Sequence, residues 1–192
     1  MDLVGASGPL AMPRIVVLVG ASGTGKTTLR RRLVTAGLPE DLVVSLDDLR
    51  RRARSLDVSR GRRVRPLQDY SALAARQALR RGEALAGFGA GYLADATHLR
   101  RRDRRLHVST AQDTGLPAVA VLTPDLPVDV LVERNEQRPP DEGVPVEVLA
   151  RQAHRRSLLS APMLLQEGFT AVWDTDDLAV VTNTCAVRPA AP

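Results

Sequence analysis

The stretch from Gly20 to Thr28 reads GASGTGKTT and contains the pattern G-x-x-x-x-G-K-[ST]. Its glycines allow successive backbone N–H groups to turn toward a phosphate, and the start of a following helix adds partial positive charge. Lys26 would place a compact cation beside the outer phosphates, and the Thr27 hydroxyl would bind Mg²⁺. We therefore expect ATP and Mg²⁺ to bind here, through Gly20, Ala21, Ser22, Gly23, Thr24, Gly25, Lys26, Thr27 and Thr28.

Lys26 is the only lysine in a chain that has 27 lysines and arginines in all. The preference for arginine, together with much Ala, Val, Leu and Pro, indicates the codon usage of a GC-rich genome. A flexible ammonium fits beside phosphates where a broad, planar guanidinium would crowd the backbone. The single lysine therefore marks a position that did not follow the compositional trend.

Two adjacent acids, Asp47 and Asp48, follow an apolar run in SLDDLR, residues 45–50. In a parallel α/β sheet the carboxyl ends of the strands face the ligand crevice, so Asp47 is placed to accept a proton from an attacking hydroxyl. The alternative is that Asp47 caps the helix that follows. Arg50 lies one helical turn later, where it can pair with Asp47 or bind an anionic acceptor.

Another carboxylate, Asp95, ends the apolar segment GYLAD at residues 91–95. Its position suits an acid that reaches Mg²⁺ through water, but it could equally cap a helix or hold a neighbouring arginine. We favour an orienting or structural role, and we count Asp95 with Arg50 among the expected substrate-binding residues. No second acid follows Asp95, so the paired acids of a hydrolytic ATPase are absent from this segment.

Arg134 and Arg138 are spaced i, i+4 in ERNEQR and precede the Pro- and Gly-rich segment PPDEGVP, residues 139–145. Two cations on a mobile flap suit a lid that closes on a transferring phosphoryl group and neutralises its developing charge. The alternative is a solvated helix face on which the arginines pair with neighbouring glutamates. We expect a lid at about residues 128–145, with both arginines acting in catalysis.

The formal net charge of +5 suits an anionic partner such as nucleic acid. Two arginine-rich segments account for much of it: Arg50, Arg51, Arg52, Arg54, Arg60, Arg62, Arg63 and Arg65 in the first, and Arg100, Arg101, Arg102, Arg104 and Arg105 in the second. The first segment adjoins Asp47, so polyanion binding and a solvated surface are equally good interpretations. We expect the second to be solvated surface. Aromatic residues make up only 3% of the chain, which argues against an extended platform for stacking bases.

Short apolar runs alternate with helical segments along the whole chain. We expect strands at 14–19, 41–46, 91–95, 117–123 and 169–175, helices at 26–36, 47–54, 67–85, 98–115 and 127–138, and one long helix or two at 146–168. This alternation predicts an α/β domain of the P-loop NTPase type, with a mostly parallel sheet of about five strands flanked by helices and a helical lid. The domain would span residues 14–180, between tails at 1–13 and 181–192.

Four blocks of the sequence, taken together and in this order, resemble the 5′-hydroxyl polynucleotide kinase domain of bacterial end-healing repair proteins, a branch of the small P-loop kinases. They are GASGTGKTT, SLDDLR, GYLADATHLRRRDRR, and ERNEQR with the later QEGF. The resemblance covers about residues 14–175. One departure is His98, which stands where that family usually has Asn.

The resemblance implies a role for each matching residue. Lys26 and Thr27 would hold ATP and Mg²⁺, Asp47 would be the general base on the 5′-hydroxyl, and Arg50 would bind the phosphate next to the acceptor nucleoside. Arg134 and Arg138 would act from the lid.

The expected activity is therefore transfer of the γ-phosphate of ATP to a 5′-hydroxyl end of RNA or DNA. Two alternatives remain at this point: a kinase of a small molecule such as a sugar, nucleoside or antibiotic, and an ATP-binding switch protein without an acceptor. The N-terminal segment has an acid at Asp2 and no basic region, so it does not read as a signal peptide, and no apolar run approaches the length of a membrane span. We expect a cytoplasmic protein with no membrane association, and the lone cysteine, Cys185, rules out an intrachain disulfide.

Overall fold

A computed structural model describes residues 13–139 and 142–175 of the chain. The expected tails, at 1–13 and 181–192, fall almost wholly outside the described residues, as does Cys185. Among the described residues, no helix is both long and apolar enough to cross a membrane.

The sheet has five strands, as predicted: β1 Ile15–Val19, β2 Val43–Ser45, β3 Tyr92–Asp95, β4 Ala118–Leu122 and β5 Ala171–Asp174. Their order in space is β2-β3-β1-β4-β5, and every neighbouring pair is parallel. All the strands therefore end at one edge of the sheet. In the register of β2 and β3, Ser45 lies opposite Asp95, so the segments that follow these two strands start side by side.

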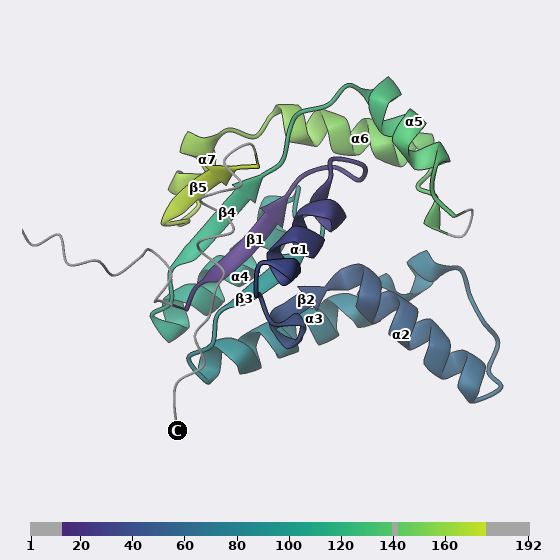
Figure 1. Ribbon diagram of the computed structural model, residues 1–192, viewed down its shortest axis with the longest axis horizontal. Coiled ribbons are helices and arrows are strands. Elements are labelled where there is room, and N and C mark those ends of the chain that lie inside the picture. The colour runs from purple at the N-terminus through teal and green to yellow at the C-terminus, as the bar shows by residue number, and fades with distance from the viewer. Residues whose placement is uncertain (1–12, 140–141, 176–192) are drawn as a thin grey trace, which may run out of the picture.

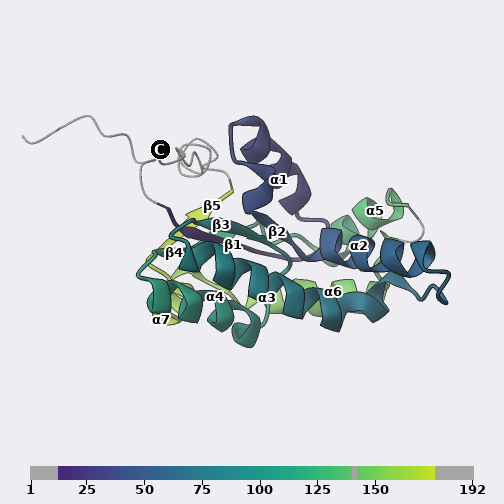
Figure 2. The same ribbon diagram turned by 90° about the horizontal axis from the view of Figure 1, so that it is seen from below.

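Seven α-helices surround the sheet in the described part of the chain. They are α1 Lys26–Thr35, α2 Leu46–Ser59, α3 Ser71–Gly87, α4 Arg101–Thr114, α5 Val128–Glu136, α6 Val146–Ser157 and α7 Ala161–Gln166. Helix α1 covers one face of the sheet, while α3, α4, α6 and α7 lie on the other (Figure 2). Helices α2 and α5 extend past the carboxyl ends of the strands (Figure 1).

Strand β1 separates two apolar cores because its side chains alternate between the faces of the sheet. Val16 and Leu18 pack with Leu29 and Leu33 of α1. Ile15, Val17 and Val19 point to the other face, into a core that also contains Val108 of α4, Leu131 of α5 and Leu164 of α7. A strand that is buried on both faces needs a continuous apolar run, which explains the sequence IVVLV.

The boundaries of two predicted helices, those at 47–54 and 98–115, are wrong. Helix α2 continues to Ser59, five residues beyond the predicted end at 54. Helix α4 begins at Arg101 rather than at 98, because His98 adopts a left-handed backbone conformation with φ of 43°. Residues 146–168, expected to form one long helix or two, form two helices, α6 and α7, and the second has Pro162 in its first turn, where proline is tolerated.

Candidate active site

The loop between β1 and α1 has the geometry of a phosphate-binding loop. Gly23 and Gly25 have φ values of +89° and +91°, which are readily available only to glycine. Gly20 lacks a side chain for a different reason, since a Cβ there would lie 1.6 Å from Oγ1 of Thr123. Helix α1 starts with no side-chain cap and no acidic residue in its first turn, so its N-terminal partial charge faces the loop without an internal counter-charge.

Lys26 is held at the mouth of this loop by the backbone itself. Its Nζ donates hydrogen bonds to the carbonyl oxygens of Gly20, at 3.1 Å, and Ala21, at 2.6 Å. Burial lowers the pKa of Lys26 to about 8, although the nearby carboxylates of Asp95 and Asp47 act in the opposite direction. Within the described residues no carboxylate forms an ion pair with Lys26, and such a half-buried ammonium is well suited to meet an incoming anion.

These features fit the polyphosphate of ATP. The N-terminus of α1, the positive-φ glycines and the Lys26 ammonium present donors and positive charge on one side of the loop. Among the described residues, no group of three or more His, Cys, Asp or Glu could hold a metal ion. Mg²⁺ fits instead as a nucleotide-bound ion, because it keeps several waters and takes few protein oxygens, which Thr27 and Asp95 can supply directly or through water.

A cavity of about 400 Å³, which we call the phosphate cleft, opens beside the loop. The predicted site residues that line it are Ser22, Lys26, Thr27, Asp47, Arg50, Asp95 and Arg138. They come from separate parts of the chain and meet because β1, β2 and β3 all end at this edge. Ala21 and Thr24 are buried beneath the loop, where the Thr24 hydroxyl contacts Ala21 and Thr123, so their side chains support the loop rather than face the cleft.

Asp47 lies at the first turn of α2 with its side chain exposed to solvent. It does not cap the helix, because the hydroxyl of Ser45 does so by accepting a hydrogen bond from the Asp48 N–H at 3.4 Å. Nη1 of Arg50 donates to Oδ1 of Asp47 at 2.6 Å, and Nε of Arg50 donates to the hydroxyl of Ser71 at 3.1 Å. Arg50 therefore fixes the carboxylate of Asp47 while the other carboxylate oxygen stays available.

Asp95 is far less exposed than Asp47, and burial raises its pKa even though Lys26 and Arg30 favour the charged form. Nη1 of Arg30, on α1, approaches Oδ2 of Asp95 at 3.5 Å. Asp95 caps no helix, since α4 starts only after Arg100. It therefore holds a neighbouring arginine, one of the roles considered from the sequence, while remaining on the wall of the phosphate cleft.

The two lid arginines reach the loop in different ways. Nη1 of Arg134 donates a hydrogen bond of 2.9 Å to the carbonyl oxygen of Gly23. Arg138 lines the phosphate cleft. The expectation that both lie on one helix is wrong, because α5 ends at Glu136 and Arg138 follows it. The segment after α5 is held to α2 by Glu142, whose carboxylate accepts a hydrogen bond of 2.9 Å from Arg51.

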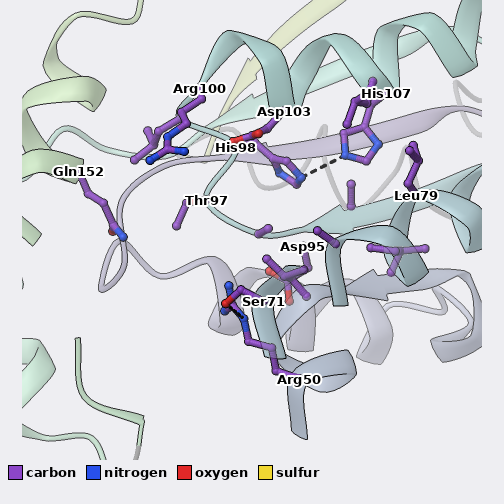
Figure 3. Close-up of a pocket in the computed structure, with 18 of the residues that line it drawn as sticks. Arg50, Ser71, Leu79, Asp95, Thr97, His98, Arg100, Asp103, His107 and Gln152 are labelled. Carbon is purple, nitrogen blue, oxygen red and sulfur yellow. Dashed lines mark hydrogen bonds between the residues drawn. The ribbon is translucent and has the colours of Figure 1, made fainter. Parts of the chain in front are cut away.

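A second cavity, of about 480 Å³, adjoins the phosphate cleft, and we call it the side chamber. The two cavities share Arg50, Asp95, Thr97 and Gln152 on their walls. Figure 3 shows Arg50 and Ser71 at one end of the side chamber and His98 and His107 at the other. Asp47 lines only the phosphate cleft, and Arg50, which is on the walls of both cavities, links it to the side chamber.

A chain of hydrogen bonds fixes the two histidines. Nδ1 of His98 lies 2.8 Å from the carbonyl oxygen of Leu18, which can only accept, so this nitrogen carries the proton. Burial lowers the pKa of His98 to about 4, which leaves its Nε2 unprotonated at neutral pH. Nε2 of His107 must then donate across the 3.1 Å contact to His98, and Nδ1 of His107 accepts from the hydroxyl of Tyr92 at 2.9 Å.

Arg104 contradicts the expectation that residues 100–105 are solvated surface, since its relative exposure is 1%. Its guanidinium makes two hydrogen bonds to the carboxylate of Glu167, at 2.7 and 2.5 Å, and a third to the backbone oxygen of His98, at 2.9 Å. A charge in this position is tolerated because it is fully paired. Arg101, Arg102 and Arg105 are exposed, as expected.

Sequence reasoning missed Gln152, whose Oε1 accepts a hydrogen bond of 2.7 Å from the backbone N–H of Ser22. It also missed that α6 lies beside the cleft and places Arg151 and Arg155 on the side chamber. The spacing i, i+4 of these two arginines was visible in ARQAHRRS and matches that of the lid pair. What the sequence lacked was any sign that this face of α6 points to the site.

The comparisons with known proteins agree with this geometry. Residues 15–159 match the family described as AAA domain. A comparison with curated protein sequences finds no match.

Three solved structures are similar to this chain. A candidate kinase from Chloroflexus aurantiacus has a TM-score of 0.62 at 19% identity, over 89% of this chain and 95% of that one. A gluconokinase from Sinorhizobium meliloti has a TM-score of 0.51 at 22% identity, over 92% and 91%. A tunicamycin resistance protein from Deinococcus radiodurans has a TM-score of 0.51 at 17% identity, over 92% and 99%.

None of these three structures is described as a polynucleotide kinase, so that part of the resemblance stays a prediction. The likeness at these identities concerns the fold. The family match covers most of the chain and includes the phosphate-binding loop, Asp47, Asp95 and the lid. The chain belongs to the AAA domain family and has the P-loop kinase fold.

Proposed function

We propose that the protein is an ATP-dependent kinase that transfers the γ-phosphate to the 5′-hydroxyl end of RNA or DNA. The observation that carries the proposal is the meeting, in one cavity, of a phosphate-binding lysine, an exposed carboxylate and a cationic lid residue. Lys26 meets the donor phosphates, Asp47 faces the space where an alcohol would enter, and Arg138 of the lid segment lines the same cavity. These are the parts that phosphoryl transfer to an alcohol needs.

Each residue has a defined part in the reaction. Asp47 accepts the proton of the 5′-hydroxyl as its oxygen forms a bond to the γ-phosphorus. The bond from that phosphorus to the β,γ-bridging oxygen breaks, and ADP leaves with the bonding electrons. Lys26, Arg134 and Arg138 offset the negative charge on the transferring group, while Arg50 orients Asp47 and binds the phosphate next to the acceptor nucleoside. Mg²⁺, bound with ATP at Thr27, supplies further charge neutralisation.

Charge is our reason for favouring nucleic acid over a small molecule as the acceptor. The net charge of +5 and the arginines around both cavities favour a polyanionic acceptor over a neutral one. A small-molecule acceptor is the second candidate, because a chamber of about 480 Å³ falls in the range of pockets that hold such ligands. The chemistry at Asp47 is the same in both cases.

The test is transfer of labelled γ-phosphate to a 5′-hydroxyl oligonucleotide, compared between the wild type and Asp47→Asn. We expect the variant to lose at least about 10²-fold in rate while its affinity for ATP is nearly unchanged. Asp113→Asn, an exposed acid on α4 outside both cavities, is the matched control and should keep the wild-type rate. Labelling of gluconate or nucleosides, but not of oligonucleotides, would establish the small-molecule alternative. ATP hydrolysis without any acceptor would favour the switch protein.

A further inference from the structure

The side chamber is open because one helix presents small side chains to it. Ala72, Ala75, Ala78 and Leu79 of α3 line the chamber, and Ser71 at the start of the same helix accepts a hydrogen bond from Arg50. Alanine side chains are short, so this wall of the side chamber is flat and its side chains do not fill the cavity. The described residues that line the chamber include no Phe, Tyr or Trp, so the only aromatic rings on this described wall are those of His98 and His107.

Three cations also lie on the walls of the chamber. Arg100 precedes the first turn of α4, and Arg151 and Arg155 lie one turn apart on α6. Within residues 13–139 and 142–175, none of the three guanidinium groups forms an ion pair with a carboxylate. Asp103, an acid on the chamber wall, is paired with Arg102 at 3.5 Å. The three arginines therefore have no counter-charge of their own within the described part of the chain.

The basic segment that follows Asp47 differs from these three arginines. Only Arg50 and Arg51 of that segment line either cavity. Arg51 pairs with Asp48 at 2.7 Å and with Glu142 at 2.9 Å. Arg62 and Arg65 lie 3.7 and 3.9 Å from Asp57. Apart from Arg50 and Arg51, the dense basic segment that follows Asp47 therefore contributes no cation to either cavity, whereas α6 contributes Arg151 and Arg155.

We propose that the side chamber binds the acceptor strand beyond its first phosphate, and that Arg100, Arg151 and Arg155 contact the backbone phosphates there. This inference rests on the proposed function. With the 5′-hydroxyl at Asp47 and the first phosphate at Arg50, the chain of the acceptor continues into the chamber that shares Arg50 on its wall. Guanidinium groups suit phosphates because their donors match phosphate oxygens two at a time.

The test compares two acceptors. A nucleoside 3′-monophosphate has a 5′-hydroxyl and a single phosphate, so it reaches Asp47 and Arg50 only, whereas a pentanucleotide extends into the chamber. We expect Arg151→Gln/Arg155→Gln to raise the KM for the pentanucleotide about tenfold or more, because charge-assisted hydrogen bonds are removed. The KM for the nucleoside 3′-monophosphate, the KM for ATP and kcat should stay at wild-type values.

Salt dependence gives a second readout. The slope of log KM for the pentanucleotide against log salt should become shallower by about 1.4, or about 0.7 for each of the two phosphates that the variant no longer neutralises. Arg62→Gln/Arg63→Gln makes the same change of charge outside both cavities and should alter neither the KM nor the slope.

The outcomes separate the two proposals. If the wild type labels neither acceptor, the proposed function fails and this subsite fails with it. If the wild type labels both, but Arg151→Gln/Arg155→Gln leaves the KM for the pentanucleotide unchanged, the subsite alone is overturned. An equal rise in KM for both acceptors would also overturn it, because the arginines would then act on the terminal nucleoside rather than on the strand beyond it.

Discussion

The phosphate-binding loop and the side chamber meet at the same edge of the sheet, but backbone groups form the first and side chains form the second. The loop is one continuous segment whose shape comes from backbone torsions, with φ near +90° at two glycines and a lysine bonded to carbonyl oxygens. The side chamber is formed by side chains from α2, α3, α4 and α6, which are far apart in the sequence.

This difference reflects what each region has to recognise. A triphosphate is the same in every P-loop kinase, so its site can be made of backbone N–H groups that do not change with the sequence. Acceptors differ in shape and charge, so the acceptor region must be adjustable one side chain at a time. The comparison predicts that the loop fails when its geometry changes, even if the charge is kept. The chamber should instead respond to changes of charge.

The largest expected effect is that of Lys26→Arg, which keeps the charge and changes the shape. The ammonium sits 3.1 and 2.6 Å from two carbonyl oxygens, a space that a planar guanidinium would crowd. We expect the transfer rate to fall by about 10² to 10³, the usual cost of losing one charge-stabilising donor. Arg32→Lys, the reverse exchange on the exposed side of α1, should have no effect. A rate within about tenfold of the wild type for Lys26→Arg would show that charge alone is sufficient.

The next effect concerns the histidines of the side chamber and appears as pH-dependent stability. The pKa of His98 is about 4 because of burial, below the ordinary value of 6.5, so the unfolded chain binds this proton first as the pH falls. The stabilisation is complete above about pH 6.5 and is lost on the way down to about pH 4, by on the order of 3 kcal/mol.

The measurement is the free energy of unfolding in urea at about pH 7 and about pH 4. Between these two pH values the free energy of unfolding should fall less in His98→Asn than in the wild type, by on the order of 3 kcal/mol. This difference is expected whatever the stability of the variant at neutral pH. His154→Asn changes an exposed histidine on α6 and should show the wild-type drop. An equal drop in His98→Asn and the wild type would contradict the assignment of His98 as a buried histidine whose pKa is lowered by burial.

The smallest expected effect is that of Gly20→Ala, which changes no charge. The new Cβ would lie 1.6 Å from Oγ1 of Thr123, so the loop or the segment after β4 must shift. We expect the free energy of unfolding in urea to fall by about 1–3 kcal/mol, as for other overpacked sites. Gly87→Ala lies in α3 with open space around it and should be neutral or slightly stabilising. Equal results for the two variants would mean that the loop adapts more easily than its packing indicates.

The sequence predicted the phosphate-binding loop, the parallel sheet and the position of Asp47, because each depends on local patterns. A glycine-rich turn after an apolar strand is visible within a short window, and parallel strands must end at one edge. The sequence did not predict that α6 faces the cleft or that Arg104 is buried. Those facts depend on how the helices pack against one another. The residue type alone does not distinguish an exposed arginine from one in a pocket.

The arginine-rich segments show this limit most clearly. Residues 50–65 attracted attention because of their density, whereas Arg151 and Arg155 are two cations in an ordinary amphipathic helix. The density of arginines along the chain reflects only the local composition. The placement of arginines around a cavity depends on how α3, α4 and α6 are arranged in space. Because these helices are far apart in the sequence, no short window of residues shows that arrangement.

The pairing of Arg104 with Glu167 has a consequence for the way the chain is made. Glu167 lies close to the end of the described residues, and through Arg104 it holds the backbone oxygen of His98. On the ribosome, the floor of the side chamber therefore lacks its last support until residue 167 leaves the exit tunnel. The loop also waits for later residues, because Thr24 is bonded to Thr123 and the Ser22 N–H to Gln152. Both cavities of the site are thus completed late in synthesis, when nearly all of the described chain has emerged.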